Sequence, residues 1–175
     1  SYQIISKYFN IPILVFMLIA QPLWSSVTDA YTKKDFSWIK NTVKKMEKIS
    51  FYFFIMIVFM FFVSDYVFLF WLNDQNIHFS FLLKFLWALF SALFVLNMIY
   101  TYAINGMGKI KLQLYFSIFS SIINIPLSII FASYFNLGTS GVILATIISI
   151  LIYIPYKYIQ YHRLVNETAT GLWNQ

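Results

Sequence analysis

Apolar residues dominate five long stretches of the chain, and short polar segments separate them. The stretches cover about residues 8–27, 49–72, 85–104, 112–135 and 142–161. A membrane-spanning helix needs about 20 mostly apolar residues, whereas a transmembrane barrel shows alternating segments of about ten. Residues 51–62 (FYFFIMIVFMFF) do not alternate. The pattern therefore predicts an all-α integral membrane protein with about five transmembrane helices.

The composition agrees with a membrane location. Of the 175 residues, 61% are hydrophobic, 22% are aromatic and 10% are charged, and the mean hydropathy is +0.74. This argues against a disordered chain, and so few charged side chains cannot coat a soluble enzyme of this size. The absence of cysteine excludes disulfides, thiolate metal sites and cysteine nucleophiles. Because the chain begins at Ser1 and shows no signal peptide, we expect it to be part of a longer protein.

The net charge of +6 arises from 12 Lys and Arg residues against 6 Asp and Glu residues. These basic residues lie between apolar stretches, so membrane orientation explains them better than a nucleic-acid partner. Ten of them share one predicted side: Lys33, Lys34, Lys40, Lys44, Lys45, Lys48, Lys109, Lys111, Lys157 and Arg163. Lys7 and Lys84 fall on the other side. The positive-inside rule therefore places residues 28–48 and the C-terminal tail, 162–175, in the cytoplasm.

The connection over residues 28–48 has the pattern of a basic amphipathic helix. Asp35 is a suitable N-cap, and one face then carries Phe36, Ile39, Val43, Met46 and Ile49, with lysines around the other face. Such a helix would lie in the headgroup layer. Two interpretations remain, a sensor of anionic lipid and an ordinary connector that obeys the positive-inside rule, and the second is favoured.

Polar residues recur on one face of several predicted spans. In span 112–135 the stripe consists of Gln113, Ser117, Ser120, Ser121, Asn124 and Ser128. Such stripes either pack helices together through hydrogen bonds or line a hydrated cavity. Prolines 12, 22, 126 and 155 should kink their helices. The candidate cavity residues are Lys7, Gln21, Lys84, Asn97, Gln113, Asn124 and Gln160.

Motifs of catalysis and metal binding are missing from the sequence. It holds no cluster of His, Asp and Glu at metal-ligand spacing, no nucleophile elbow, no phosphate-binding glycine loop and no paired intramembrane carboxylates. We therefore expect no catalytic site, no metal site and no cofactor. Lys84 either extends to the headgroups or faces a cavity, where it would attract an anionic group.

Three segments resemble polysaccharide and O-antigen flippases of the multidrug/oligosaccharidyl-lipid/polysaccharide exporter superfamily. They are residues 21–31 (QPLWSSVTDAY) with the basic run 33–40 (KKDFSWIK), the turn 105–109 (NGMGK), and 134–146 (YFNLGTSGVILAT). The segments occur in the family's order and extend over nearly the whole chain. The resemblance implies the C-terminal portion of a two-lobed transporter with twelve or fourteen helices.

The resemblance also implies a function. Such a protein moves undecaprenyl-pyrophosphate-linked oligosaccharide across the bacterial inner membrane by alternating access, without being an enzyme. Its partners would be this lipid-linked substrate, membrane lipids and other polysaccharide assembly proteins. One alternative is a multidrug exporter of the same superfamily, coupled to an H+ or Na+ gradient. Others are a structural membrane subunit or a polymerase or ligase of polysaccharide assembly, although the outer loop at about 64–84 is short for an enzyme.

Overall fold

The computed structural model describes residues 2–72 and 79–175, and it contains five long helices. These are α1 (Tyr2–Thr32), α2 (Phe36–Leu72), α3 (Phe81–Gly106), α4 (Lys111–Ile129) and α5 (Thr139–Val165). A π-helical turn, η1 (Ile130–Tyr134), extends α4, and a short 3-10 helix, η2 (Gly171–Asn174), follows α5. All five are long and apolar enough to cross a membrane, and the described residues form no strand. The expected all-α fold is confirmed.

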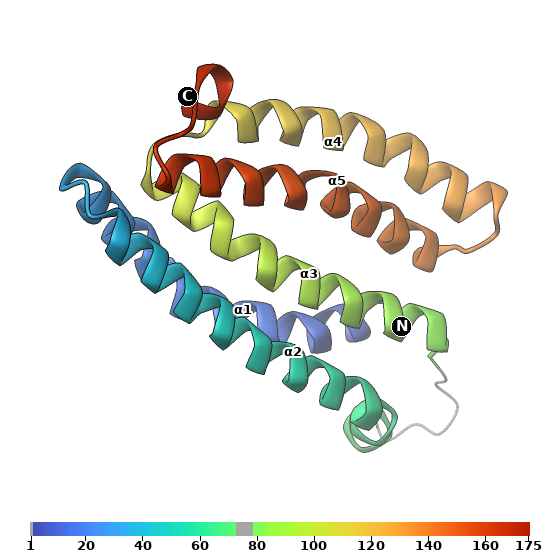
Figure 1. Ribbon diagram of the computed structural model, residues 1–175. Helices are drawn as coiled ribbons and strands as arrows, with labels where there is room; N and C mark the ends of the chain where they lie inside the picture. Colours follow the sequence, from blue (N-terminus) through green and yellow to red (C-terminus); the bar gives the residue numbers. More distant parts are fainter. Residues whose placement is uncertain (1, 73–78) are drawn as a thin grey trace.

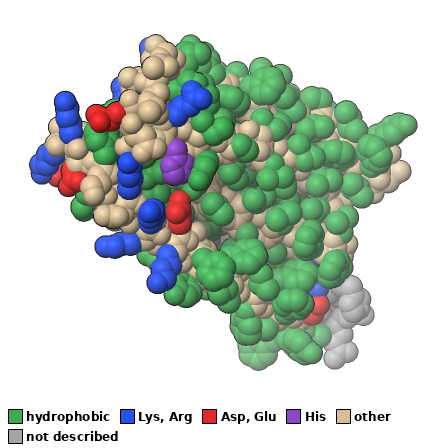
Figure 2. All heavy atoms as spheres, viewed as in Figure 1, with side chains coloured by type: hydrophobic (Ala, Val, Ile, Leu, Met, Phe, Trp, Pro, Cys, Tyr) green, Lys and Arg blue, Asp and Glu red, His purple; other side chains and the backbone are tan. Residues whose placement is uncertain are grey.

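The helices lie in a row with α3 at its centre (Figure 1). α1 and α2 pack on one side of α3 and on each other, α5 packs on the opposite side, and α4 packs on α5 at the edge of the molecule. The α1–α2 turn, the α3–α4 turn and the C-terminal turn all lie at one end (Figure 1). Basic side chains gather at that end, and hydrophobic side chains cover most of the remaining surface in the view of Figure 2. The three segments that the sequence predicts to share a side are therefore neighbours in space.

Two clusters of buried apolar side chains hold the bundle together. Phe16 of α1, Val43 of α2 and Ile99 of α3 belong to the cluster nearer the basic end. Phe9 of α1 and Trp87 of α3 belong to the second cluster, which Ile143 and Ile147 of α5 complete. Helices α1, α2, α3 and α5 contribute to both clusters, whereas α4 keeps most of its apolar surface exposed. An exposed apolar surface of this kind suits contact with lipid or with further helices.

The basic connection is the first part of a helix that continues through the second span. Asp35 caps it, since the Trp38 backbone N–H donates to Asp35 Oδ1 over 2.9 Å. Ile39 and Val43 are buried in the core instead of facing a headgroup layer. Residues 36–72 contain neither glycine nor proline, so nothing in the sequence breaks the helix between its basic and apolar parts. The separate amphipathic helix expected at 36–48 is therefore replaced by one continuous α2.

Two glycines of the flippase-like segments allow helices to approach closely. A Cβ on Gly106 would lie 2.7 Å from the Trp24 carbonyl oxygen, and the Thr28 hydroxyl donates to the Gly106 carbonyl over 2.9 Å. A Cβ on Gly141 would lie 2.5 Å from the Phe131 carbonyl carbon in η1. Both glycines thus permit backbone contact between helices, as small residues do in membrane bundles.

Residues 73–78 of the predicted outer loop lie outside the described residues.

Candidate functional site

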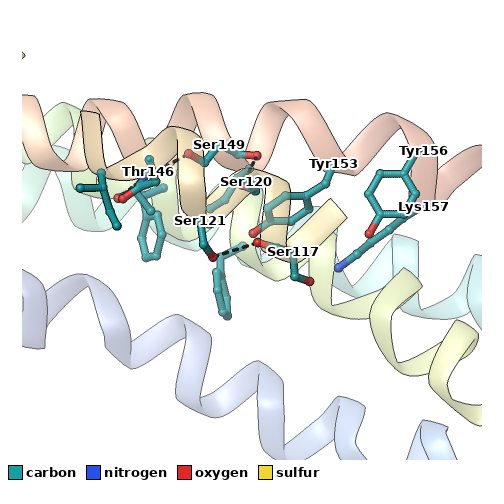
Figure 3. A pocket seen from close by; sticks show the side chains of 13 residues that line it. Ser117, Ser120, Ser121, Thr146, Ser149, Tyr153, Tyr156 and Lys157 are labelled. Atoms are coloured by element: carbon teal, nitrogen blue, oxygen red, sulfur yellow. Dashed lines mark hydrogen bonds between the residues drawn. The ribbon is translucent and has the colours of Figure 1, made fainter. Parts of the chain in front are cut away.

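A cavity of about 470 Å³ lies between α3, α4 and α5 (Figure 3). Its polar lining comes mainly from α4 and α5: Ser117, Ser120, Ser121, Asn124, Thr146, Ser149, Tyr153, Tyr156 and Lys157. Phe90 and Phe94 of α3 and Ile125 and Ile150 supply apolar walls. The polar residues follow helical spacing on their two helices, so one face of α4 meets one face of α5 across the cavity. The polar stripe of α4 predicted from the sequence therefore forms much of one wall.

Hydrogen bonds within this wall join α4 to α5. Asn124 Nδ2 donates to Ser149 Oγ over 3.1 Å, and the Ser120 hydroxyl donates to the Ser149 carbonyl over 3.3 Å. The hydroxyls of Ser117 and Ser121 instead donate to carbonyls one turn earlier on α4. Ser120 and Asn124 thus pack α4 on α5 and also line the cavity, so helix packing and cavity lining are combined in the same members of the stripe.

Lys157 is the charged group of the cavity. The residue has a relative exposure of 5%, and its Nζ donates to Asn97 Oδ1 over 2.9 Å and to Thr101 Oγ1 over 2.7 Å. The same Nζ lies 4.9 Å from the centre of the Tyr153 ring. Within residues 2–72 and 79–175, no carboxylate pairs with it. Because an ammonium has three N–H donors and these bonds use two, one donor remains for an anionic ligand.

Of the seven candidates from the sequence, Asn97 and Asn124 lie at this site. Asn97 holds Lys157, and Asn124 lines the cavity. Gln113 is half-buried on α4 outside the lining, and its Oε1 has no partner among the described residues. Lys7 and Gln21 are exposed on α1. The structure therefore does not bring the seven residues into one cavity.

Two further candidates are engaged in structural contacts away from the cavity. Lys84, with 6% relative exposure, forms an ion pair with Asp65 of α2, so its charge is already compensated. Gln160 is fully buried, and its Nε2 donates to the carbonyls of Lys109, over 3.0 Å, and Trp173, over 3.4 Å. It thereby ties the C-terminal segment to the α3–α4 turn. Of residues 162–175, expected as a tail, 162–165 complete α5, and the end of the chain lies against this turn, where Lys109 Nζ donates to the Asn174 carbonyl over 3.1 Å.

Sequence reasoning missed two residues that the structure brings forward. Lys157 was assigned to the cytoplasmic positive charges, although it follows the polar residue Tyr153 by one helical turn in the span 142–161. Glu47 accepts a hydrogen bond of 2.7 Å from the Tyr100 hydroxyl and so links α2 to α3. The helical spacing from Tyr153 was the available signal for Lys157, whereas only the packing of α2 on α3 shows the partner of Glu47.

Comparison with protein families decides the class of the molecule. The MatE family matches residues 1–130, which include α1, α2, α3 and all of α4. The chain belongs to the MatE family. Members of this family are membrane transporters of the multidrug/oligosaccharidyl-lipid/polysaccharide superfamily, so the superfamily indicated by the sequence resemblance is confirmed. The match ends before α5, and Lys157 therefore lies outside it. No curated protein and no solved structure matches the chain.

Proposed function

We propose that this MatE-family protein moves lipid-linked oligosaccharide across the bacterial inner membrane, with its C-terminus in the cytoplasm. The polar head of such a substrate passes through the cavity between α3, α4 and α5 while its lipid tail remains in the bilayer. The cavity alternates in its access to the two sides. An H+ or Na+ gradient would drive the cycle, and other proteins of polysaccharide assembly would supply and receive the substrate.

The observation that carries the proposal is the chemistry of the cavity. Hydroxyl and amide groups line it, and its one cation, Lys157, is held by the neutral residues Asn97 and Thr101. Hydroxyl and amide groups can exchange hydrogen bonds with the hydroxyls of a sugar, and the ammonium suits a pyrophosphate. Tyr153 and Tyr156 add aromatic surface. A polar group inside a span costs free energy, so a lysine kept there with no carboxylate partner among the described residues supports a functional role.

A multidrug exporter of the same superfamily is the second candidate, and Glu47 is the observation that favours it. Such an exporter needs an acidic group to bind the coupling cation, and Glu47 is half-buried and hydrogen-bonded to Tyr100. The flippase is preferred because the cavity offers a cation and many hydroxyls, whereas a cationic drug would need a carboxylate. Loss of drug export with Glu47→Gln, in cells whose lipid-linked oligosaccharide is delivered normally, would favour the exporter.

The test uses cells with and without the full-length gene. A membrane-impermeant sugar-modifying enzyme, added to the periplasm, reports how much lipid-linked oligosaccharide has crossed the membrane. We expect complete units to accumulate on the cytoplasmic side in the deletion strain and to return to the periplasm when the gene is restored. Normal delivery in the deletion strain, in the absence of a second transporter for these units, would reject the proposal.

A further inference from the structure

A second cavity, a groove of about 760 Å³, opens between α2, α3 and α5, and no residue of α4 lines it. Lys40 and Lys44 of α2 and His162 of α5 lie at one end of it. Phe51 and Phe54 of α2, with Leu93 of α3, lie further along. Figure 2 shows basic side chains and a histidine at the basic end of the molecule, next to a continuous hydrophobic surface. The groove is therefore polar at one end and apolar along the rest.

The helical repeat of α2 produces this gradient. Lys40, Lys44, Glu47, Phe51 and Phe54 follow one another at intervals of four, three, four and three residues, so they share one face of the helix. The same face thus changes from basic to aromatic along the helix axis. On α3 the apolar residues of the groove precede Tyr100, which lies toward the basic end. The groove runs parallel to the helix axes, which is also the direction in which lipid molecules extend in a bilayer.

The lysines of the groove can bind an anion. Neither Lys40 nor Lys44 forms an ion pair within the part of the chain that the structure describes. The one carboxylate of the groove, Glu47, accepts the Tyr100 hydroxyl. Two lysines against one carboxylate leave an excess of positive charge at this end. The positive-inside rule directs the same end toward the cytoplasmic leaflet, where anionic lipids are concentrated.

We infer that the groove binds one anionic phospholipid. Its phosphate lies between Lys40, Lys44 and His162, and one acyl chain lies along Phe51, Phe54 and Leu93. The lipid contacts α2, α3 and α5 together, and it thereby stabilises the packing of α2 and α5 on α3. This site is separate from the cavity that holds Lys157, so the inference does not depend on which substrate the protein carries.

Native mass spectrometry of the purified full-length protein in detergent tests the inference. Phosphatidylglycerol is added to one sample and phosphatidylcholine to another, and the fraction of protein with one bound lipid is measured. We expect a phosphatidylglycerol complex and little phosphatidylcholine complex. Glycerol phosphate alone should not compete, because it lacks the acyl chain that the apolar part of the groove accepts.

Charge variants locate the site. Lys40→Gln/Lys44→Gln should weaken phosphatidylglycerol binding by about tenfold, since each lysine near an anionic lipid contributes about a fivefold effect before mutual screening. Lys45→Gln/Lys48→Gln is the matched control, because both lysines are exposed on the same helix and neither lines the groove. Ala92→Phe, which fills the apolar part of the groove and leaves every charge in place, should also weaken binding. Unchanged unfolding temperatures without lipid identify variants that fold normally.

Three results would overturn the inference. The first is equal loss of lipid binding in the groove variant and the control, which would show attraction by surface charge alone. The second is equal binding of phosphatidylcholine and phosphatidylglycerol. The third is stronger binding of undecaprenyl phosphate than of phosphatidylglycerol with the same dependence on Lys40 and Lys44, which would assign the groove to the transported lipid.

Discussion

Lys157 of α5 donates a hydrogen bond of 2.9 Å to Oδ1 of Asn97 on α3, and this bond joins two helices inside the molecule. Both partners are nearly buried, and Asn97 is neutral, so the bond stabilises the ammonium without cancelling its charge. An ion pair with a carboxylate would hold the side chain equally well but would leave little charge for a ligand. The geometry therefore suits a residue that must attract an anion.

Removal of the Asn97 side chain should destabilise the protein mainly while Lys157 is present. Asn97→Ala should lower the free energy of unfolding by about 1 kcal/mol, because one hydrogen bond between helices is lost. In a Lys157→Met background the same substitution should cost much less, since no ammonium then needs a partner. Unfolding in mixed detergent and SDS micelles measures the four proteins of this double-mutant cycle. Equal losses in the two backgrounds would contradict the coupling of the two residues.

The ion pair between Lys84 and Asp65 should respond asymmetrically to substitution. Asp65→Asn leaves an unpaired ammonium whose side chain is 7% exposed, whereas Lys84→Met leaves a carboxylate whose side chain is 70% exposed. We expect Asp65→Asn to lower the free energy of unfolding by about 2 kcal/mol and Lys84→Met to change it by less than about 1 kcal/mol. The same unfolding assay measures both. A larger loss for Lys84→Met would show that Lys84 is stabilised by something other than Asp65.

Gln160 should control the order of the C-terminal segment. Gln160→Ala removes the donors to the carbonyls of Lys109 and Trp173, so the α3–α4 turn should open more often. Trypsin cleavage after Lys109 should then be about tenfold faster, as expected for the loss of one or two hydrogen bonds. Thr170→Ala, at an exposed position of the same segment, is the control. Equal cleavage rates for wild type, variant and control would show that Gln160 does not hold the turn.

The helices were predictable from the sequence because each apolar stretch is long enough to cross a membrane. The start of α2 was less predictable from the sequence. Its basic part, 36–48, has the amphipathic pattern of a surface helix, yet Ile39 and Val43 pack into the bundle core. The pattern gives the buried face correctly, but a hydrophobic face can enter the boundary between lipid headgroups and acyl chains or pack on other helices equally well. Only the position of α1 and α3 decides between these partners.

The candidate site was less predictable, because each helix has several polar residues and their partners lie far along the chain. Lys157 and Asn97 are 60 residues apart, so neither identifies the other in the sequence. A lysine near the end of a span fits the positive-inside rule whether it faces water or a cavity. Gln160 lies one turn beyond Tyr156 in the same span, but the carbonyls of Lys109 and Trp173 take its hydrogen bonds. Helical periodicity therefore identifies the polar faces of the helices. It does not show which of these faces is covered by a neighbouring segment and which lines a cavity.

The most direct test of the account is transport by the Lys157 variant. A strain that lacks the gene is complemented with wild type, Lys157→Gln or the exposed control Lys45→Gln, at equal protein level, and the rate at which lipid-linked oligosaccharide reaches the periplasm is measured. Lys157→Gln should lower this rate by about tenfold or more, because a charge-assisted hydrogen bond to the pyrophosphate is lost, while the control remains at the wild-type rate. Wild-type delivery by Lys157→Gln would contradict the role of the cavity in carrying the anionic head.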